Sequence, residues 1–103
     1  MQVKKETNGS EMTASISGRI DINSSPVLAA ELENIPEEIS TMVLDFGELN
    51  YVSSAGLRVI FQLHKRMKER GGNMIIRHVN DFVLEILDSV GFLDVFTVEK
   101  QED

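Results

Sequence analysis

Two adjacent serines, Ser53 and Ser54, lie where an apolar run gives way to a helical pattern. The run spans residues 41–46, a loop is expected after it, and apolar side chains then recur at helical spacing from Leu57 to Met67. A serine at a helix start accepts hydrogen bonds from first-turn amides, and the positive end of the helix dipole favours an added phosphate there. The pair is therefore interpreted either as a helix cap, which is the more frequent role, or as a phosphorylation site.

Residues 43–60 resemble the signature of the STAS family, the small anti-sigma factor antagonists (anti-anti-sigma factors) of bacteria. In that family a strand and a loop precede Asp-Ser-Ser-Gly-Leu or a near variant, and here the pattern is Ser53-Ser54-Ala55-Gly56-Leu57. Alignment on Gly56 places the family's phosphoacceptor at Ser54, while Ser53 takes a position that is frequently acidic and is the alternative acceptor. Residues 18–32 and 81–92 also resemble family segments, so the resemblance covers nearly the whole chain.

The resemblance implies a binding protein and not an enzyme. The unphosphorylated protein would bind an anti-sigma factor, often itself a serine kinase, and so free a sigma factor for transcription. Phosphorylation of Ser54 would reverse the binding, and because ATP and magnesium would belong to the kinase, no cofactor is expected of this chain. We expect the partner to contact Asp21, Ser53, Ser54, Ala55, Gly56 and Arg58.

Two alternative functions stay open on the sequence. A STAS subunit could regulate a membrane transporter by docking to it without any phosphorylation. The chain could also be a docking module in a larger signalling assembly. Identification of the bound partner would separate these possibilities.

Catalytic and metal chemistry find little support in the sequence. A serine hydrolase needs a base on the hydroxyl, but His64 lies about three turns along the helix from Ser54, roughly 15 Å away at 1.5 Å per residue. His64 is therefore interpreted as a core histidine with satisfied hydrogen bonds or as a half-buried one, and His78 belongs to a predicted strand with no motif near it. No metal-ligand spacing and no Gly-x-x-x-x-Gly-Lys loop occurs, so neither a metal site nor a P-loop is expected.

The net charge of −7 argues against direct nucleic-acid binding, which needs clustered Lys and Arg. The charges are also unevenly placed, since no Lys or Arg occurs between Arg19 and Arg58. The helix after the serines, by contrast, is rich in basic side chains: Arg58, Lys65, Arg66, Lys68 and Arg70. The two sides of the serine loop thus differ in sign, and such a field could steer a protein partner.

The length of 103 residues predicts one domain, residues 1–103, with a single modest core. Cysteine is absent, which excludes disulfides and thiolate zinc sites. Residues 1–8 carry charges and no apolar run, so we expect neither a signal peptide nor membrane insertion. The expected protein is cytoplasmic and a monomer or weak dimer.

The elements predicted to position the serines follow the order ββαβαβαβ. Asn8-Gly9 predicts a hairpin, and Pro26 early in a helix predicts its start at Ser24-Ser25. The expected strands are residues 2–7, 12–16, 41–46, 73–79 and 95–98, and the better-defined helices are residues 54–70 and from Asn80 or Asp81 to 90. Strands separated by helices imply parallel neighbours. We therefore predict a single-domain STAS-like α/β fold, a mixed sheet of about five strands with packed helices.

Overall fold

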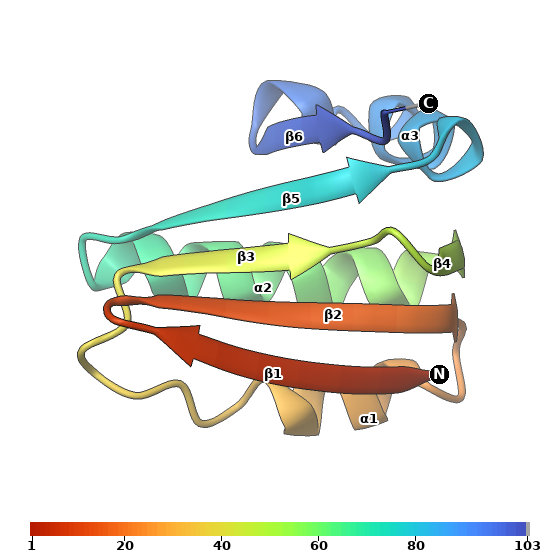
Figure 1. Cartoon of the computed structure of the whole chain (residues 1–103). Coiled ribbons are helices and arrows are strands. Elements are labelled where there is room, and N and C mark those ends of the chain that lie inside the picture. The colour runs from red at the N-terminus through yellow and green to blue at the C-terminus, as the bar shows by residue number, and fades with distance from the viewer. Residues whose placement is uncertain (103) are drawn as a thin grey trace.

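Strands β1 (Gln2–Asn8) and β2 (Glu11–Ile20) form the antiparallel hairpin that Asn8-Gly9 predicts (Figure 1). Gly9 has a positive φ of 62°, the backbone conformation that tight hairpin turns require. This and all later geometry comes from a computed structural model that describes residues 1–102. Strand β1 lies at one edge of the sheet, and the sheet continues from β2 on the other side of the hairpin.

The sheet is mixed and has six strands, one of which pairs with β2 outside the main order. Three further strands run parallel to β2 and give the order β1-β2-β3-β5-β6. These strands are β3 (Thr41–Asp45), β5 (Asn73–Val79) and β6 (Thr97–Lys100). Three helices, α1 (Ser25–Glu31), α2 (Ser54–Glu69) and α3 (Asp81–Ser89), pack on the face that lies behind the sheet in Figure 1. No helix among residues 1–102 covers the opposite face (Figure 1). The predicted α/β class and mixed sheet are confirmed.

The segment expected to be a loop contains an additional short strand, β4 (Leu49–Val52). Strand β4 pairs in parallel with the end of β2, where Ile20 is opposite Val52. Strand β2 is 10 residues long and β3 only 5, so without β4 the end of β2 would leave buried backbone groups unpaired. The sheet therefore has six strands instead of about five, and the serines follow β4 directly.

Helix α2 carries the serines and is fixed to the fold on two sides. Its buried residues face the sheet, and their spacing is that of one helical face: Gly56, Leu57, Ile60, Leu63 and Met67. The guanidinium groups of Arg66 and Arg70 donate hydrogen bonds to carbonyls after α1, at 2.6 Å to Leu32 O and 2.9 Å to Pro36 O. These contacts hold the C-terminal end of α2 against the segment that follows α1.

The C-terminal elements differ slightly from the predicted ones. Asn80 caps α3, as its side chain accepts from the Val83 amide at 2.8 Å. Gly91 has a φ of 78° and ends that region, but a 3₁₀ helix, η1 (Phe92–Asp94), follows it and moves the last strand to residues 97–100. Among residues 1–102, no helix has the length and apolar character of a membrane span.

Candidate functional site

Ser53 is the N-cap of helix α2. Its backbone is extended, with φ −86° and ψ 172°, and its hydroxyl oxygen accepts from the Gly56 amide at 3.2 Å. This is the usual hydrogen bond from a third-residue amide to a cap side chain, and it satisfies one of the unpaired donors of the first turn. The side chain is half-buried, so one of the two serines has the capping role.

Ser54 is the first residue of α2, and its side chain is exposed. It shares a helix face with Arg58, which is also exposed and lies four residues further along. The first-turn amides and the positive end of the helix dipole give this position a partial positive charge. The hydroxyl of Ser54 is thus accessible at a place that suits an anion.

Asp21 organises the loop between β2 and α1. Its Oδ1 accepts from the amides of Asn23 and Ser24, at 3.0 and 2.9 Å, and from the Ser24 hydroxyl at 3.1 Å. The hydrogen bond from the Ser24 amide is the main reason that the pKa of Asp21 lies below its usual range. The carboxylate therefore shapes this loop, a role that the sequence did not predict beside the expected partner contact.

The Asp21 loop and the serine loop lie next to each other. The Ser53 amide donates to the carbonyl of Ile20 at 2.7 Å, and Asp21 follows Ile20 in the chain. Ile22 in this loop is 74% exposed, and the guanidinium of Arg19 lies 4.5 Å from the centre of the Tyr51 ring in β4. Ile22 was not among the residues expected to contact a partner, because a single apolar residue in a polar turn is common on protein surfaces.

Gly56, which is among the residues expected to contact the partner, does not lie on the exposed surface with Ser54. It is buried, and a Cβ added there would lie 2.5 Å from Cγ2 of Ile20 and 2.8 Å from Cγ2 of Val52. Its missing side chain lets α2 approach the ends of β2 and β4. Ala55 is half-exposed, while Ser54 and Arg58 are exposed.

Comparison with known proteins identifies the family. The sequence profile of the STAS domain matches residues 2–103. The chain belongs to the STAS domain family. It is 23% identical to the anti-sigma-B factor antagonist of Bacillus subtilis (strain 168) over 103 residues, which cover 100% of this chain and 94% of the relative.

Two solved structures show the same fold. An anti-sigma factor antagonist from Mycobacterium paratuberculosis is similar with a TM-score of 0.84 at 16% identity, over 95% of this STAS domain and 84% of that chain. The Bacillus cell fate determinant SpoIIAA, solved in its phosphorylated form, is similar with a TM-score of 0.74 at 12% identity, over 94% and 90% of the two chains. The fold of the present STAS domain is thus shared with these proteins.

His64 of the STAS domain is a packing residue, as its position on the apolar face predicts. Its ring makes an edge contact with Phe96, at 4.7 Å between centroids, and lies 6.2 Å from Phe61. Its Nδ1 is buried without a hydrogen-bond partner. Burial is the main cause that lowers the pKa of His64 below its usual 6.5, and the nearby charge of Lys68 lowers it further.

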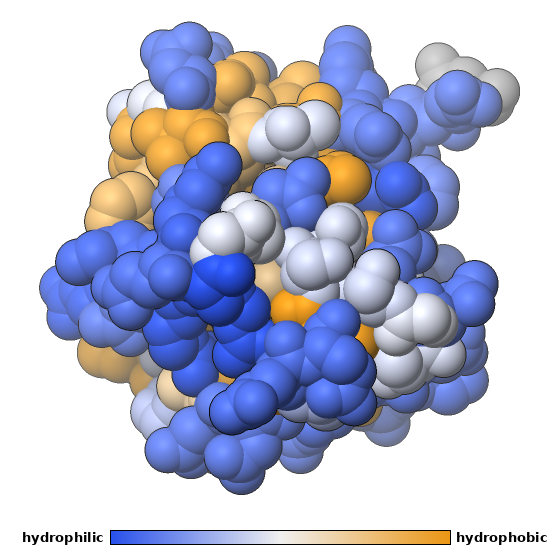
Figure 2. Space-filling model, turned by 90° about the vertical axis from the view of Figure 1, so that its left-hand side faces the viewer, coloured by the Kyte–Doolittle hydropathy of each residue, from blue (hydrophilic) through white to orange (hydrophobic). Residues whose placement is uncertain are grey.

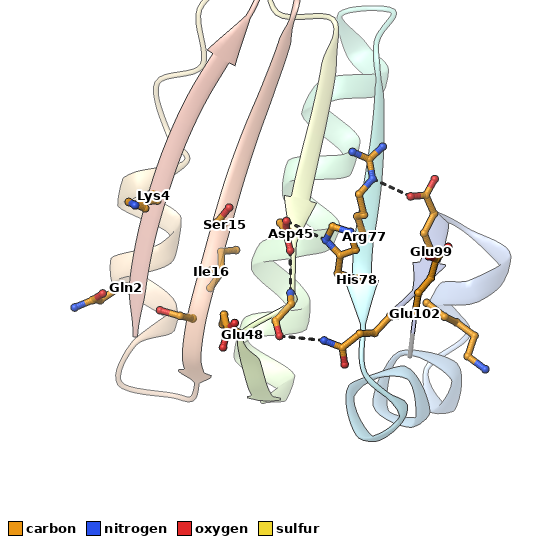
Figure 3. Close-up of a pocket in the computed structure, with 14 residues that line it drawn as sticks. Gln2, Lys4, Ser15, Ile16, Asp45, Glu48, Arg77, His78, Glu99 and Glu102 are labelled. Atoms are coloured by element: carbon orange, nitrogen blue, oxygen red, sulfur yellow. Dashed lines mark hydrogen bonds and ion pairs between the residues drawn. The ribbon is translucent and has the colours of Figure 1, made fainter.

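His78, for which the sequence offered no neighbouring motif, pairs with Asp45 across the ends of β5 and β3. Its Nδ1 lies 3.1 Å from Oδ2 of Asp45, whose Oδ1 accepts from the Gly47 amide at 2.9 Å (Figure 3). His78 also has a φ of 62°, an uncommon conformation for a residue other than glycine. Carboxyl ends of parallel strands meet at one edge of a sheet, so the two side chains could have been predicted to lie close.

The Asp45–His78 pair lies in a polar groove of about 1170 Å³ on the helix-free face of the sheet (Figure 3). Arg77 and Glu99 form a second pair there, with 2.8 Å between Nε and Oε1. Cations and carboxylates alternate in this groove, and no group of three or more His, Asp or Glu side chains in the described part of the chain could hold a metal ion. The groove lies on the face of the sheet opposite α2.

Proposed function

We propose that this protein is an anti-sigma factor antagonist of the bacterial cytoplasm, a binding module that an anti-sigma factor with serine kinase activity switches off by phosphorylating Ser54. In the unmodified state it would occupy the kinase and thereby free a sigma factor. The family membership supports this class of function, and relatives over nearly the full chain are named for it. The observation that carries the proposal is that Ser53 caps helix α2 while Ser54 is exposed beside it.

The geometry favours Ser54 over Ser53 as the phosphoacceptor. A kinase must reach the hydroxyl, and the Ser54 side chain is exposed at the first residue of α2. The Ser53 oxygen is half-buried and already engaged with the Gly56 amide at 3.2 Å. Transfer of a phosphoryl group to Ser53 would require its oxygen to leave the Gly56 amide, whereas transfer to Ser54 leaves that hydrogen bond in place.

Electrostatics supplies the switch. A phosphate on Ser54 adds a charge of about −1.5 to −2 to an exposed surface next to Arg58. In the free protein the helix dipole and Arg58 would tolerate this charge, so the fold would lose little stability. In the complex the same group must be desolvated against the partner, where it repels acidic side chains and prevents close packing. The cost therefore falls on binding.

The docking surface proposed for the kinase contains Ser54, Arg58 and the half-exposed Ala55 at the start of α2. The Asp21 loop extends it, because the Ile20–Ser53 hydrogen bond joins the two loops and Ile22 is 74% exposed beside them. Ile22 offers apolar contact area to a partner on this otherwise polar loop. Gly56 contributes by setting the height of α2 above the sheet and not by direct contact.

The proposal is tested with the serine kinase that a pull-down recovers from the native cell. Isothermal titration should give an affinity for Ser54→Asp that is lower by about tenfold or more, or roughly 1.4 kcal/mol. Ser54→Ala should bind like the unmodified protein and resist inactivation by ATP. Urea unfolding serves as the control and should show Ser54→Asp to be as stable as the parent. Equal affinity of Ser54→Asp and the parent would contradict the proposal and favour a transporter-docking subunit.

A further inference from the structure

The exposed face of α2 carries a basic stripe that begins at Ser54. Residues at spacings of four and three along the helix lie on one face, and here all of them are exposed: Ser54, Arg58, Phe61, Lys65 and Lys68. The stripe holds three cations and no carboxylate on a chain whose net charge is −7. From Ser54 to Lys68, 14 positions further along the helix, it extends about 21 Å at 1.5 Å per residue.

The cations of this stripe are not engaged elsewhere in the fold. Arg58, Lys65 and Lys68 take part in none of the ion pairs formed among residues 1–102. The neighbouring Arg66 and Arg70, by contrast, are bound to the carbonyls after α1 and face that helix. Helix α2 thus separates its basic side chains into a structural set beside α1 and an accessible set on the basic stripe.

An apolar patch adjoins the stripe at η1, and we define it as Phe61, Phe92, Leu93 and Val95. Phe61 stacks on Phe92 with 6.2 Å between the ring centroids. Phe61, Leu93 and Val95 are 40%, 36% and 45% exposed. Figure 2 shows apolar surface gathered in its upper left part, at the level of η1 and β6 in Figure 1. Large exposed apolar side chains beside charges mark interaction sites more often than isolated ones do.

We infer that the basic stripe and the apolar patch together bind an acidic amphipathic segment of the partner kinase, with its carboxylates on Arg58, Lys65 and Lys68 and its apolar side chains on the patch. Charge complementarity selects this occupant, because the chain as a whole is acidic and repels an acidic segment, whereas the basic stripe presents three exposed cations and attracts it. The inference rests on the proposed function, since it extends the Ser54 surface along α2. It also explains why phosphorylation of Ser54 would weaken binding.

Phosphorylation of Ser54 would act on the stripe at its first position. The phosphate would lie one helical turn from Arg58, so it can pair with that guanidinium and remove one of the three cations available to the partner. It would also place a negative charge at the end of a path that an acidic segment must follow. The modified helix therefore offers the segment a weaker and partly repulsive field.

The test compares two double charge reversals of equal size by isothermal titration with the kinase that phosphorylates the wild-type protein. Lys65→Glu/Lys68→Glu reverses the stripe, and Lys4→Glu/Lys100→Glu reverses two exposed lysines that line the groove on the opposite face of the sheet. We expect the stripe variant to raise the Kd by about tenfold or more and the control to stay within about twofold. Phe61→Ser should raise the Kd by about fivefold, with circular dichroism confirming that each variant is folded.

The outcomes separate the two proposals. If the wild-type protein binds no kinase, the proposed function fails. If it binds and the stripe and groove variants have equal affinity, the inference is overturned while the Ser54 switch stands. A second readout is the dependence of Kd on salt concentration. This dependence should be steep for the wild type and the groove variant and shallow for the stripe variant. Concentration-dependent self-association that Phe61→Ser abolishes would instead assign the patch to a second copy of this chain and overturn the inference.

Discussion

The hydroxyl oxygen of Ser53 accepts a hydrogen bond from the backbone amide of Gly56 at 3.2 Å, and this contact distinguishes the two serines. It gives Ser53 to the helix cap and leaves Ser54 exposed at the first position of α2. Gly56 itself is buried against Ile20 and Val52. A structural cap and an accessible hydroxyl thus lie side by side, and their mutational signatures should differ.

Removal of the cap should destabilise the fold where removal of the neighbouring hydroxyl does not. Ser53→Ala leaves the Gly56 amide without its partner and should lower the free energy of unfolding by about 0.5–2 kcal/mol. Ser54→Ala, the matched control, should stay within about 0.5 kcal/mol of the parent because its side chain is exposed. Urea titrations followed by circular dichroism measure both. Equal losses in the two variants would show that the cap is misassigned.

A methyl group at position 56 should strain the junction of α2 with the sheet. The added Cβ of Gly56→Ala would lie 2.5 Å from Ile20 Cγ2 and 2.8 Å from Val52 Cγ2, and both are methyl groups on stiff β-branched side chains. We expect a loss of about 1–3 kcal/mol in unfolding free energy, as for other overpacked sites. Gly56→Leu should be worse and is not a clean probe of binding. Parent-like stability of Gly56→Ala would contradict this close packing.

Stability should depend on pH through His64. Because burial lowers the pKa of His64 below 6.5, the unfolded chain binds more protons than the folded chain between the two pKa values. The unfolding free energy therefore rises with pH in that window. The stability that depends on the neutral form of His64 is fully present above pH 6.5 and is lost as the pH falls through the pKa of the folded state. The slope from one group is at most about 1.4 kcal/mol per pH unit.

Replacement of His64 isolates this effect. Urea unfolding between pH 5 and pH 8 should show the rise in the parent and a smaller one in His64→Leu. The variant should still bind the kinase and be phosphorylated, since His64 packs on Phe96 and Phe61 and leucine can keep that apolar packing. An identical pH profile in the two proteins would show that another group controls it.

The loop beside the serines should depend on the Asp21 carboxylate. Asp21→Ala removes the acceptor of the Asn23 and Ser24 amides, so both amides should exchange with solvent faster. Asp21→Asn keeps a side-chain oxygen and should preserve most of the protection. Hydrogen exchange followed by NMR tests this directly. Unchanged exchange in Asp21→Ala would mean that the loop holds its shape without that side chain.

The sequence predicted those parts of the fold that depend on local pattern. The Asn8-Gly9 turn and the long amphipathic helix from Ser54 follow from turn chemistry and helical spacing, and both are present. Strand β4 was missed because its four residues are too few to show the alternation of apolar and polar side chains that predicts a strand. Its existence follows from the length of β2, which is a tertiary constraint.

The candidate site was predictable in position and not in detail. The pattern around Gly56 located the helix start, but it could not tell which serine hydroxyl turns inward to cap α2. It also placed Gly56 among the partner contacts, because a sequence of small residues does not reveal that this one faces Ile20. The Asp45–His78 pair joins residues 33 apart in the sequence and depends on strand order, which local pattern does not fix.

The most direct test of the Ser54 switch is the site of phosphate transfer. The purified protein is incubated with the kinase and ATP, and tandem mass spectrometry assigns the modified residue. We predict phosphate on Ser54 and none on Ser53, with labelling abolished in Ser54→Ala and retained in a folded Ser53→Ala variant. Phosphate on Ser53, or undiminished labelling of Ser54→Ala, would contradict the assignment of Ser54 as the switch.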